Sequence, residues 1–150
     1  MTIESESAMK TFGARLGALF AGGEVIELVG DVGAGKTTLT KGIAEGMGIA
    51  ETVQSPSFTI SRVYDDTMTG LRLAHYDFYR LHDAGIMAEE LRETAQDSQA
   101  VTIIEWADIV SGVLPEDRLT ITITAVTETG RHVELNPHGP LSQRLAEALV

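Results

Sequence analysis

The nine residues "GDVGAGKTT", at positions 30–38, contain three glycines, a lysine and two threonines, a composition that suits neither an ordinary strand nor an ordinary helix. They match the phosphate-binding loop pattern G-x-x-x-x-G-K-[ST], in which Gly30, Gly35, Lys36 and Thr37 occupy the fixed positions. The pattern alone can occur by chance, so the sequence on either side of the loop decides its meaning.

Strand and helix signals flank the loop in the order that phosphate binding requires. The preceding residues 24–29, "EVIELV", form an apolar, β-branched run of strand length. After the loop, Leu39, Ile43 and Met47 recur every four residues, and Gly48 is suited to end a helix. The sequence therefore predicts a strand, a nucleotide-binding loop and a helix, rather than a glycine-rich turn without function.

Each residue type in the loop has a chemical role. Gly30, Gly33 and Gly35 allow consecutive backbone N–H groups to turn toward phosphate oxygens, and the N-terminus of the following helix adds unpaired donors. We expect Lys36 to reach the β- and γ-phosphates and the Thr37 hydroxyl to bind Mg²⁺. The predicted nucleotide-binding residues of the loop are Asp31, Val32, Gly33, Ala34, Gly35, Lys36, Thr37 and Thr38.

Length and composition indicate one compact domain, which we expect to span residues 1–150. Hydrophobic residues make up 43% of the chain, enough for a sizeable core. The chain has no cysteine, which excludes a disulfide framework and a cysteine-ligated zinc site. The acidic start "MTIESES" lacks the features of a signal peptide, and no apolar stretch approaches the ~20 residues of a membrane span, so we expect a cytoplasmic protein.

The charge balance narrows the possible partners. The chain has 22 acidic and 11 basic residues, a net charge of −11, and only three lysines, at positions 10, 36 and 41. Affinity for nucleic acid rests largely on cationic side chains that displace counterions. We therefore expect no direct binding of RNA or DNA by this chain alone.

Apolar periodicity and turn residues divide the rest of the chain into helices and strands. Helices are predicted at residues 5–20, 83–97 and 141–150, and a buried strand at 101–106. Two antiparallel hairpins are also predicted, formed by residues 57–64 with 71–79 and by residues 119–126 with 131–135. The expected fold is a P-loop NTPase-like three-layer α/β/α arrangement, with a mixed central sheet that combines a parallel core and antiparallel hairpins.

Glu105 is the candidate metal-binding acid. It follows the apolar run "VTII" and should lie at the C-terminal end of a strand, where the Walker B acid of a P-loop NTPase usually stands. We expect it to bind Mg²⁺, directly or through water, although an ordinary strand-terminating glutamate is the alternative. Trp106, the only tryptophan, either belongs to the core or covers the nucleotide, and the sequence does not choose between them.

Two further segments carry candidate groups. In "HYDFYR", an extended strand would place His75, Asp77 and Tyr79 on one face. Asp77 could bind the metal or orient water, and Arg80 could meet a phosphate or a carboxylate. In "SPS", residues 55–57, the hydroxyl groups resemble a switch segment that senses the γ-phosphate, although a plain turn fits equally well.

Together, these segments resemble the TsaE (YjeE) family of bacterial proteins. "GDVGAGKTTLTKG", "SPSFT", "HYDFYRL" and "IEW" occur in the family's order and separations, and the resemblance covers residues 5–136. It implies a P-loop ATPase with ATP/ADP and Mg²⁺ as cofactors. The family resemblance further implies that the ATPase binds TsaB and TsaD and supports repeated turnover of this complex, which transfers a threonylcarbamoyl group to tRNA. Such an acidic protein would act through these partners and not by holding the tRNA itself.

The resemblance also assigns roles to residues by motif. It implies that Lys36 and Thr37 belong to the phosphate and Mg²⁺ site, that Glu105 serves the metal and catalysis, and that Asp77 lies in the catalytic region. Trp106 would lie near the nucleotide. The sequence departs mildly from the family pattern at two positions, where Thr and Pro are usual: Ser57 and Ala107.

Other functions share a phosphate-binding loop. A small-molecule kinase would need an acceptor pocket and an arginine-bearing lid, whereas the arginines of this chain are scattered. A GTPase would be expected to contain D-x-x-G and N-K-x-D motifs, and neither occurs. A nucleotide-dependent binding module stays open, because binding and turnover use the same residues.

Overall fold

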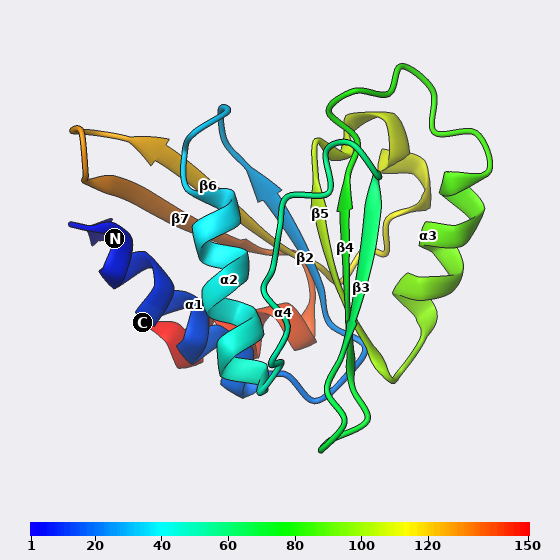
Figure 1. The fold of residues 1–150 in the computed structure, drawn as a ribbon, viewed down its shortest axis with the longest axis horizontal. Helices are drawn as coiled ribbons and strands as arrows, with labels where there is room; N and C mark the ends of the chain where they lie inside the picture. Colours follow the sequence, from blue (N-terminus) through cyan, green and yellow to red (C-terminus); the bar gives the residue numbers. More distant parts are fainter.

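A seven-stranded sheet lies between two layers of helices in the computed structural model, which describes residues 1–150 (Figure 1). The strands are β1 (Thr2–Ile3), β2 (Val25–Val29), β3 (Ser61–Asp65), β4 (Arg72–Asp77), β5 (Ala100–Glu105), β6 (Leu119–Ala125) and β7 (Arg131–Pro137). The helices are α1 (Glu6–Leu19), α2 (Lys36–Met47), α3 (Met87–Gln96), the 3-10 helix η1 (Ala107–Val113) and α4 (Pro140–Leu149).

The sheet is mixed, as the sequence predicts. Its strand order is β1-β7-β6-β2-β5-β4-β3. The central strands β6, β2, β5 and β4 pair in parallel, so their carboxyl ends lie at one edge of the sheet. The outer pairs β6–β7, β1–β7 and β3–β4 are antiparallel, which confirms both predicted hairpins.

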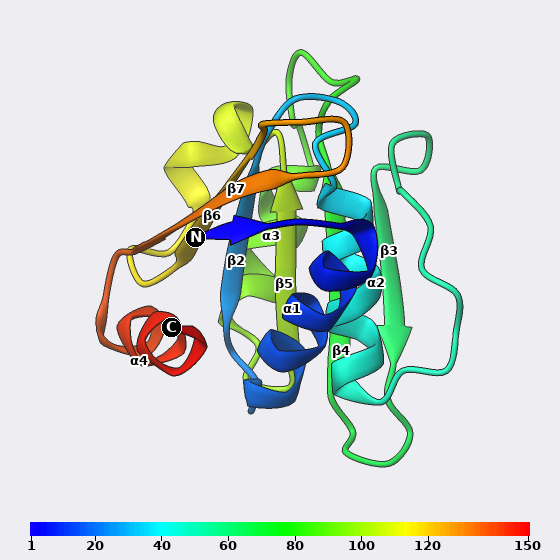
Figure 2. The ribbon, with the colours of Figure 1, turned by 90° about the vertical axis from the view of Figure 1, so that its left-hand side faces the viewer.

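Each face of the sheet has its own core. Helices α1, α2 and α4 cover one face, and α3 and η1 cover the other (Figures 1 and 2). Strand β5 serves both, since Val101 and Ile103 belong to the first core and Ile104 to the second. A strand buried on both faces reads as a continuous apolar run, and this is why "VTII" marked it in the sequence.

Helices α1 and α2 meet through their backbones. A Cβ atom built on Gly46 would lie 2.1 Å from the carbonyl oxygen of Ala14, and one on Gly42 would lie 2.2 Å from that of Lys10. Glycine inside a helix costs about 1 kcal/mol relative to alanine. Close packing explains why α2 nevertheless has these two glycines, and α1 has matching ones at Gly13 and Gly17.

Several predicted boundaries are wrong for local reasons. Residues 57–60 form a turn and not a strand, because the N–H groups of Thr59 and Ile60 both donate to the Pro56 carbonyl, at 3.1 and 2.6 Å. Strand β4 ends at Asp77, so strand alternation does not extend to Tyr79 and Arg80 as predicted. Both side chains border the same cavity instead.

The sequence did not predict two short elements, β1 and η1. Strand β1 has two residues, too few for a periodic signal, and it is ordered by pairing with β7. The 3-10 helix η1 follows β5 without a cap residue or an apolar repeat of helical length. No helix in the structure combines the length and the apolar character needed to cross a bilayer.

The close contact of Gly46 with the backbone of α1 predicts that a larger residue at this position lowers stability. We expect Gly46→Ala to lower the free energy of unfolding by about 1–2 kcal/mol, because overpacking costs of about 1–3 kcal/mol exceed the gain in helix propensity. Gly112→Ala is the matched control, since no atom lies within 4 Å of its added Cβ. Urea denaturation of both variants checks this, and equal stability would contradict the backbone contact.

Candidate functional site

The phosphate-binding loop connects the end of β2 to the start of α2, as predicted. Gly33 and Gly35 have φ angles of 82° and 113°, which side chains rarely allow, and Gly35 immediately precedes the first residue of α2. The loop therefore lies at the N-terminus of a helix, where unpaired backbone N–H groups favour an anion.

Lys36 is held between the loop and an acidic strand end. Its Nζ atom donates a hydrogen bond of 2.6 Å to the Gly30 carbonyl and lies 3.7 Å from Glu105 Oε1. The ring of Trp106 lies 4.2 Å from the same ammonium, measured to the ring centroid. The lysine side chain is only 6% exposed, so the site contains a buried positive charge.

Asp77 and Glu105 are adjacent because β4 and β5 are in register. They are direct partners in the parallel pairing of the two strands, and each is the last residue of its strand. Both are buried. Glu105 Oε2 also lies 2.6 Å from Nε2 of His75, which is completely buried. The two predicted catalytic carboxylates thus lie side by side near Lys36.

The surroundings of the Asp77 carboxyl raise its pKa. Burial raises its pKa above the ordinary value, although a hydrogen bond of 2.9 Å from the Tyr79 N–H to Oδ1 opposes this. The neighbouring Glu105 charge raises the pKa further, while His75 and Lys36 lower it. Such a carboxyl holds a proton more readily than one in water, which is typical of groups at functional sites.

A cavity of about 360 Å³ opens above these residues. It is lined by 13 residues: Val32, Gly33, Gly35, Lys36, Thr37, Thr38, Ser55, Ser57, Asp77, Tyr79, Arg80, Glu105 and Trp106. It therefore brings together most of the predicted site, including the serines of "SPS". Of the predicted nucleotide-binding residues, only Asp31 and Ala34 lie outside its lining.

Trp106 belongs to this cavity. It leaves β5 with a φ angle of 56°, one of two positive φ angles at residues other than glycine. Its ring packs against Tyr79, with ring centroids 4.9 Å apart, and lies over Lys36. The tryptophan thus lies beside Lys36 at the cavity and also packs at the margin of the second core.

The oxygen atoms in the cavity suit Mg²⁺. The Thr37 hydroxyl and the carboxylates of Asp77 and Glu105 line it, and oxygen is the ligand atom that Mg²⁺ prefers. No cluster of three His, Asp or Glu side chains is arranged to hold a metal ion by itself. Mg²⁺ usually binds through one or two protein ligands together with substrate phosphates and water.

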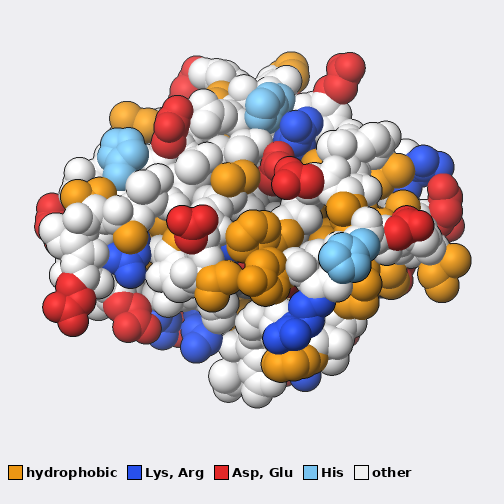
Figure 3. All heavy atoms as spheres, turned by 90° about the horizontal axis from the view of Figure 1, so that it is seen from above, with side chains coloured by type: hydrophobic (Ala, Val, Ile, Leu, Met, Phe, Trp, Pro, Cys, Tyr) orange, Lys and Arg blue, Asp and Glu red, His pale blue; other side chains and the backbone are white.

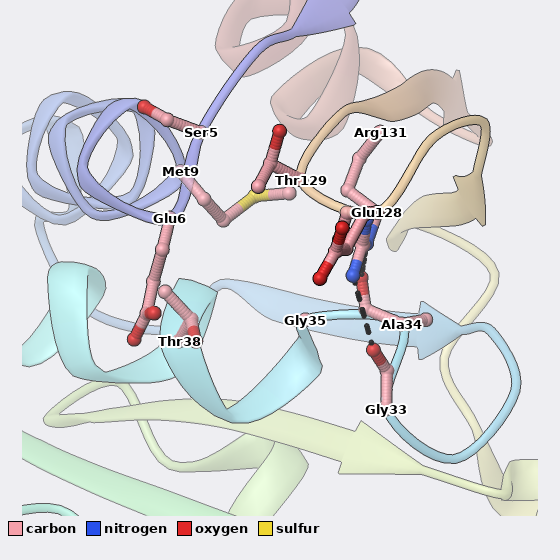
Figure 4. Close-up of a pocket in the computed structure, with 10 residues that line it drawn as sticks. All are labelled: Ser5, Glu6, Met9, Gly33, Ala34, Gly35, Thr38, Glu128, Thr129 and Arg131. Carbon is pink, nitrogen blue, oxygen red and sulfur yellow. Dashed lines mark hydrogen bonds between the residues drawn. The ribbon is translucent and has the colours of Figure 1, made fainter.

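A second cavity, of about 260 Å³, adjoins the loop on its other side (Figure 4). Gly33, Gly35 and Thr38 border both cavities. The remaining lining comes from the start of α1, the β6–β7 turn and neighbouring positions: Ser5, Glu6, Met9, Ala34, Glu128, Thr129 and Arg131. The predicted residue Ala34 therefore lies here rather than in the first cavity.

Arg131 supports the loop from this side. Its Nε atom donates a hydrogen bond of 2.8 Å to the Ala34 carbonyl, and Nη2 donates one of 3.5 Å to the Gly33 carbonyl. Nη1 donates to the Gly130 carbonyl at 3.0 Å. The sequence did not predict Arg131, because nearly 100 residues separate it from Ala34 and no local motif connects the two. It also did not predict the role of Ser5, Glu6 and Met9, which lie at the start of α1.

Comparison with known proteins identifies the family of the chain. The family described as "Threonylcarbamoyl adenosine biosynthesis protein TsaE" matches residues 3–133. The chain belongs to the TsaE family. The TsaE protein of Bacillus subtilis is 41% identical over 138 residues, which cover 91% of this chain and 84% of that protein. The TsaE protein of Streptomyces coelicolor is 39% identical over 135 residues, covering 87% of this chain and 91% of its own.

A solved structure supports the TsaE assignment at the level of the fold. The crystal structure of Bacillus subtilis YdiB superposes with a TM-score of 0.82 at 34% identity, covering 99% of this chain and 91% of that one. This confirms the predicted α/β class and mixed sheet. It also confirms the resemblance to TsaE that the four motifs indicated.

The raised pKa of Asp77 predicts how stability of this TsaE family member depends on pH. A proton bound more tightly in the folded state stabilises it at acid pH, and this contribution is lost as pH rises through the raised pKa. We therefore expect Asp77→Asn, which mimics the protonated form, to be more stable than the wild type at pH 7. The gain should shrink as pH falls toward 3.8, the ordinary carboxyl value.

Asp66→Asn provides a control of opposite sign. Hydrogen bonds from the Thr69 hydroxyl and the Met68 N–H lower the pKa of Asp66, so this variant should be less stable than the wild type at pH 7. Thermal denaturation of the three proteins between pH 4 and pH 7 measures both effects. An Asp77→Asn variant that is destabilised at pH 7 would contradict the electrostatic description of the site.

Proposed function

We propose that this protein is an ATPase that binds ATP with Mg²⁺ and hydrolyses it to ADP and phosphate, and that hydrolysis supports turnover of the TsaB–TsaD threonylcarbamoyl transferase complex. The observation that carries the proposal is the convergence of Lys36, Thr37, Asp77 and Glu105 on one cavity beside a phosphate-binding loop. The relatives of the protein are named as tRNA threonylcarbamoyladenosine biosynthesis proteins. We assign this activity to residues 1–150 as one domain, acting in the cytoplasm where tRNA is available.

The loop and Lys36 bind the phosphates in this proposal. Backbone N–H groups at Gly33 and Gly35 face an anion at the helix N-terminus. Lys36 exchanges its 2.6 Å hydrogen bond to the Gly30 carbonyl for contacts with phosphate oxygens. A charge-assisted hydrogen bond to phosphate is stronger than one to a neutral carbonyl, so this exchange favours the bound state.

Mg²⁺ would be held by the Thr37 hydroxyl and, directly or through water, by Glu105. When bound, the ion neutralises charge that develops on the phosphate oxygens. The structure offers these oxygen atoms in one cavity, and the cavity leaves room for the phosphates and water that usually complete Mg²⁺ coordination.

Asp77 orients the attacking water in this scheme. Its Oδ1 atom accepts the Tyr79 N–H, whereas Oδ2 accepts no hydrogen bond from the protein. The free oxygen can therefore accept a hydrogen bond from water. The raised pKa of Asp77 makes its carboxylate a stronger base than one in solution, which suits a group that receives a proton during hydrolysis.

The second cavity offers a place for the nucleoside. The triphosphate follows the loop toward Thr38, which borders both cavities, and the nucleoside continues into the space beyond it. There, Glu6 and Glu128 offer carboxylate acceptors to the hydroxyl and amino groups of adenosine, and the buried Met9 offers an apolar surface (Figure 4). ATP would thus span two adjoining cavities separated by the start of α2.

Two alternative functions remain as competitors of this proposal. A small-molecule kinase using the same loop would place an acceptor beside the γ-phosphate, and Arg80 is the only arginine that lines the first cavity. A nucleotide-dependent binding module would use ATP without turnover. The kinase would use the same two carboxylates, one for the metal and one as the base that accepts the proton of the acceptor hydroxyl.

Binding and hydrolysis separate cleanly in two variants. We expect Lys36→Ala to weaken ATP binding at least tenfold, because the loop then lacks its buried cation. We expect Glu105→Gln to keep appreciable ATP binding and to lose most hydrolysis, since the loop and Lys36 remain intact. Calorimetric titration and phosphate release measure the two effects. Undiminished ATP affinity of Lys36→Ala, or full turnover by Glu105→Gln, would remove that residue from the site.

The surface around the cavity suits a protein partner. Val32 and Tyr79 line the cavity and are 72% and 53% exposed, and Phe58, 83% exposed, follows directly after Ser57. Viewed from the side where the parallel strands end, apolar side chains gather near the middle of the surface (Figure 3). An apolar rim around a nucleotide site allows a partner to cover it and sense its occupant.

The partner proposal predicts coupled binding. We expect the isolated protein to hydrolyse ATP slowly and to show no specific affinity for tRNA, and to form a nucleotide-dependent complex with TsaB and TsaD. If ATP favours the complex, then the complex must tighten ATP binding by the same factor. Size-exclusion chromatography with and without ATP tests the complex, and ATP titrations with and without partners test reciprocity. Tight tRNA binding by the chain alone, or no association in any nucleotide state, would favour the kinase alternative.

A further inference from the structure

His75 lies behind the carboxylates, at a point where the proposed mechanism gives it no role. It is the fourth residue of β4, is completely buried, and pairs in the parallel ladder with Ile103. Residues two apart in a strand point to the same face, so His75, Asp77 and Glu105 all face α2 and the loop. The imidazole thereby reaches Glu105, with 2.6 Å between Nε2 and Oε2.

The hydrogen bond fixes which ring nitrogen carries the proton. An ionised carboxylate only accepts hydrogen bonds, so Nε2 must donate to Glu105. The other ring nitrogen, Nδ1, is buried and has no hydrogen-bond partner. A side chain with a purely structural role would be better placed with both nitrogens satisfied, or replaced by an apolar residue. The single contact to Glu105 is therefore the polar interaction that distinguishes histidine here.

This contact affects where the Glu105 charge lies relative to Lys36. Oε2 is occupied by His75, and Oε1 is 3.7 Å from Lys36 Nζ, too far for a hydrogen bond. Lys36 donates to the Gly30 carbonyl instead. The two buried side chains, Lys36 and Glu105, form an ion pair at this distance without a direct hydrogen bond. Without the imidazole, the carboxylate is free to turn toward the ammonium and accept a hydrogen bond from it. Such a hydrogen bond would have to be broken before Lys36 could bind phosphate.

We propose that His75 is a positioning residue that fixes the Glu105 carboxylate through its Nε2–H group and keeps it from accepting a direct hydrogen bond from Lys36. This inference rests on the proposed ATPase function, because it assigns His75 to the same site. It makes two claims that can be separated. His75 sets the orientation of Glu105 for hydrolysis, and it keeps Lys36 available for ATP.

Two polar substitutions distinguish positioning from packing. The amide nitrogen of a glutamine can occupy the place of Nε2 and donate to Glu105, whereas the shorter asparagine cannot reach it. We expect His75→Gln to retain ATP affinity and kcat within about threefold of the wild type. We expect His75→Asn and the apolar His75→Leu to lower kcat about 10–100-fold, the range usual for a residue that orients a metal-site ligand.

A double-mutant cycle with Glu105→Gln tests the second claim through ATP affinity and not through the rate of hydrolysis. In the wild-type background, His75→Asn should weaken ATP binding several-fold, because Glu105 then competes for Lys36. In the Glu105→Gln background the same substitution should change ATP affinity less than twofold, since no charge remains at position 105 to pair with the lysine. Calorimetric ATP titrations of the four proteins give this comparison directly.

The outcomes test the role of His75 separately from the proposed ATPase function. Equal impairment of His75→Gln and His75→Asn, or the same loss of ATP affinity in both backgrounds, would overturn the role of His75. If His75→Leu does not fold, as judged by circular dichroism, the glutamine and asparagine variants still decide the question. A wild-type protein that binds ATP but does not hydrolyse it would refute the ATPase proposal and leave the affinity test of His75 intact.

Discussion

The parallel alignment of β2, β5 and β4 is the constraint on which the site depends. Glu105 pairs with Leu28 on one side and with Asp77 on the other, so three strand ends meet at a single level. The phosphate-binding loop begins two residues after Leu28. Because side chains alternate along a strand, a shift of β5 by one residue would turn Glu105 toward α3 and away from the loop. The apolar residues buried on both faces of β5 hold this register.

Local sequence signals were sufficient for the central part of the fold. The loop, the strand before it and the helix after it follow from residues close together in the chain, as does the position of Glu105 at a strand end. Asp77 was also predictable as a candidate, because the segment "HYDFYRL" that contains it resembles a motif of the TsaE family. These features share one property: the residues that define each of them are neighbours in sequence.

Features created by contacts between distant segments could not be predicted. Arg131 supports the loop from 97 positions away, and the pairing of His75 with Glu105 requires knowledge of strand order as well as register. The turn at residues 57–60 was misassigned as strand because its β-branched and aromatic residues fit a strand equally well. Its conformation depends on two hydrogen bonds to the Pro56 carbonyl, and on a φ angle of 70° at Ile60 that propensity argues against.

The two walls of the first cavity differ in how they are packed. One wall belongs to α2, which contacts α1 through its backbone. Helix α2, whose first turn includes Lys36 and Thr37, packs against α1 so closely that no Cβ atom fits between the helices at Gly42 and Gly46. The opposite wall is made of the turn at residues 55–60 and the segment after β4, both largely exposed. The cavity therefore has one wall that close backbone packing holds in place and one wall that carries exposed side chains, Phe58 and Tyr79 among them.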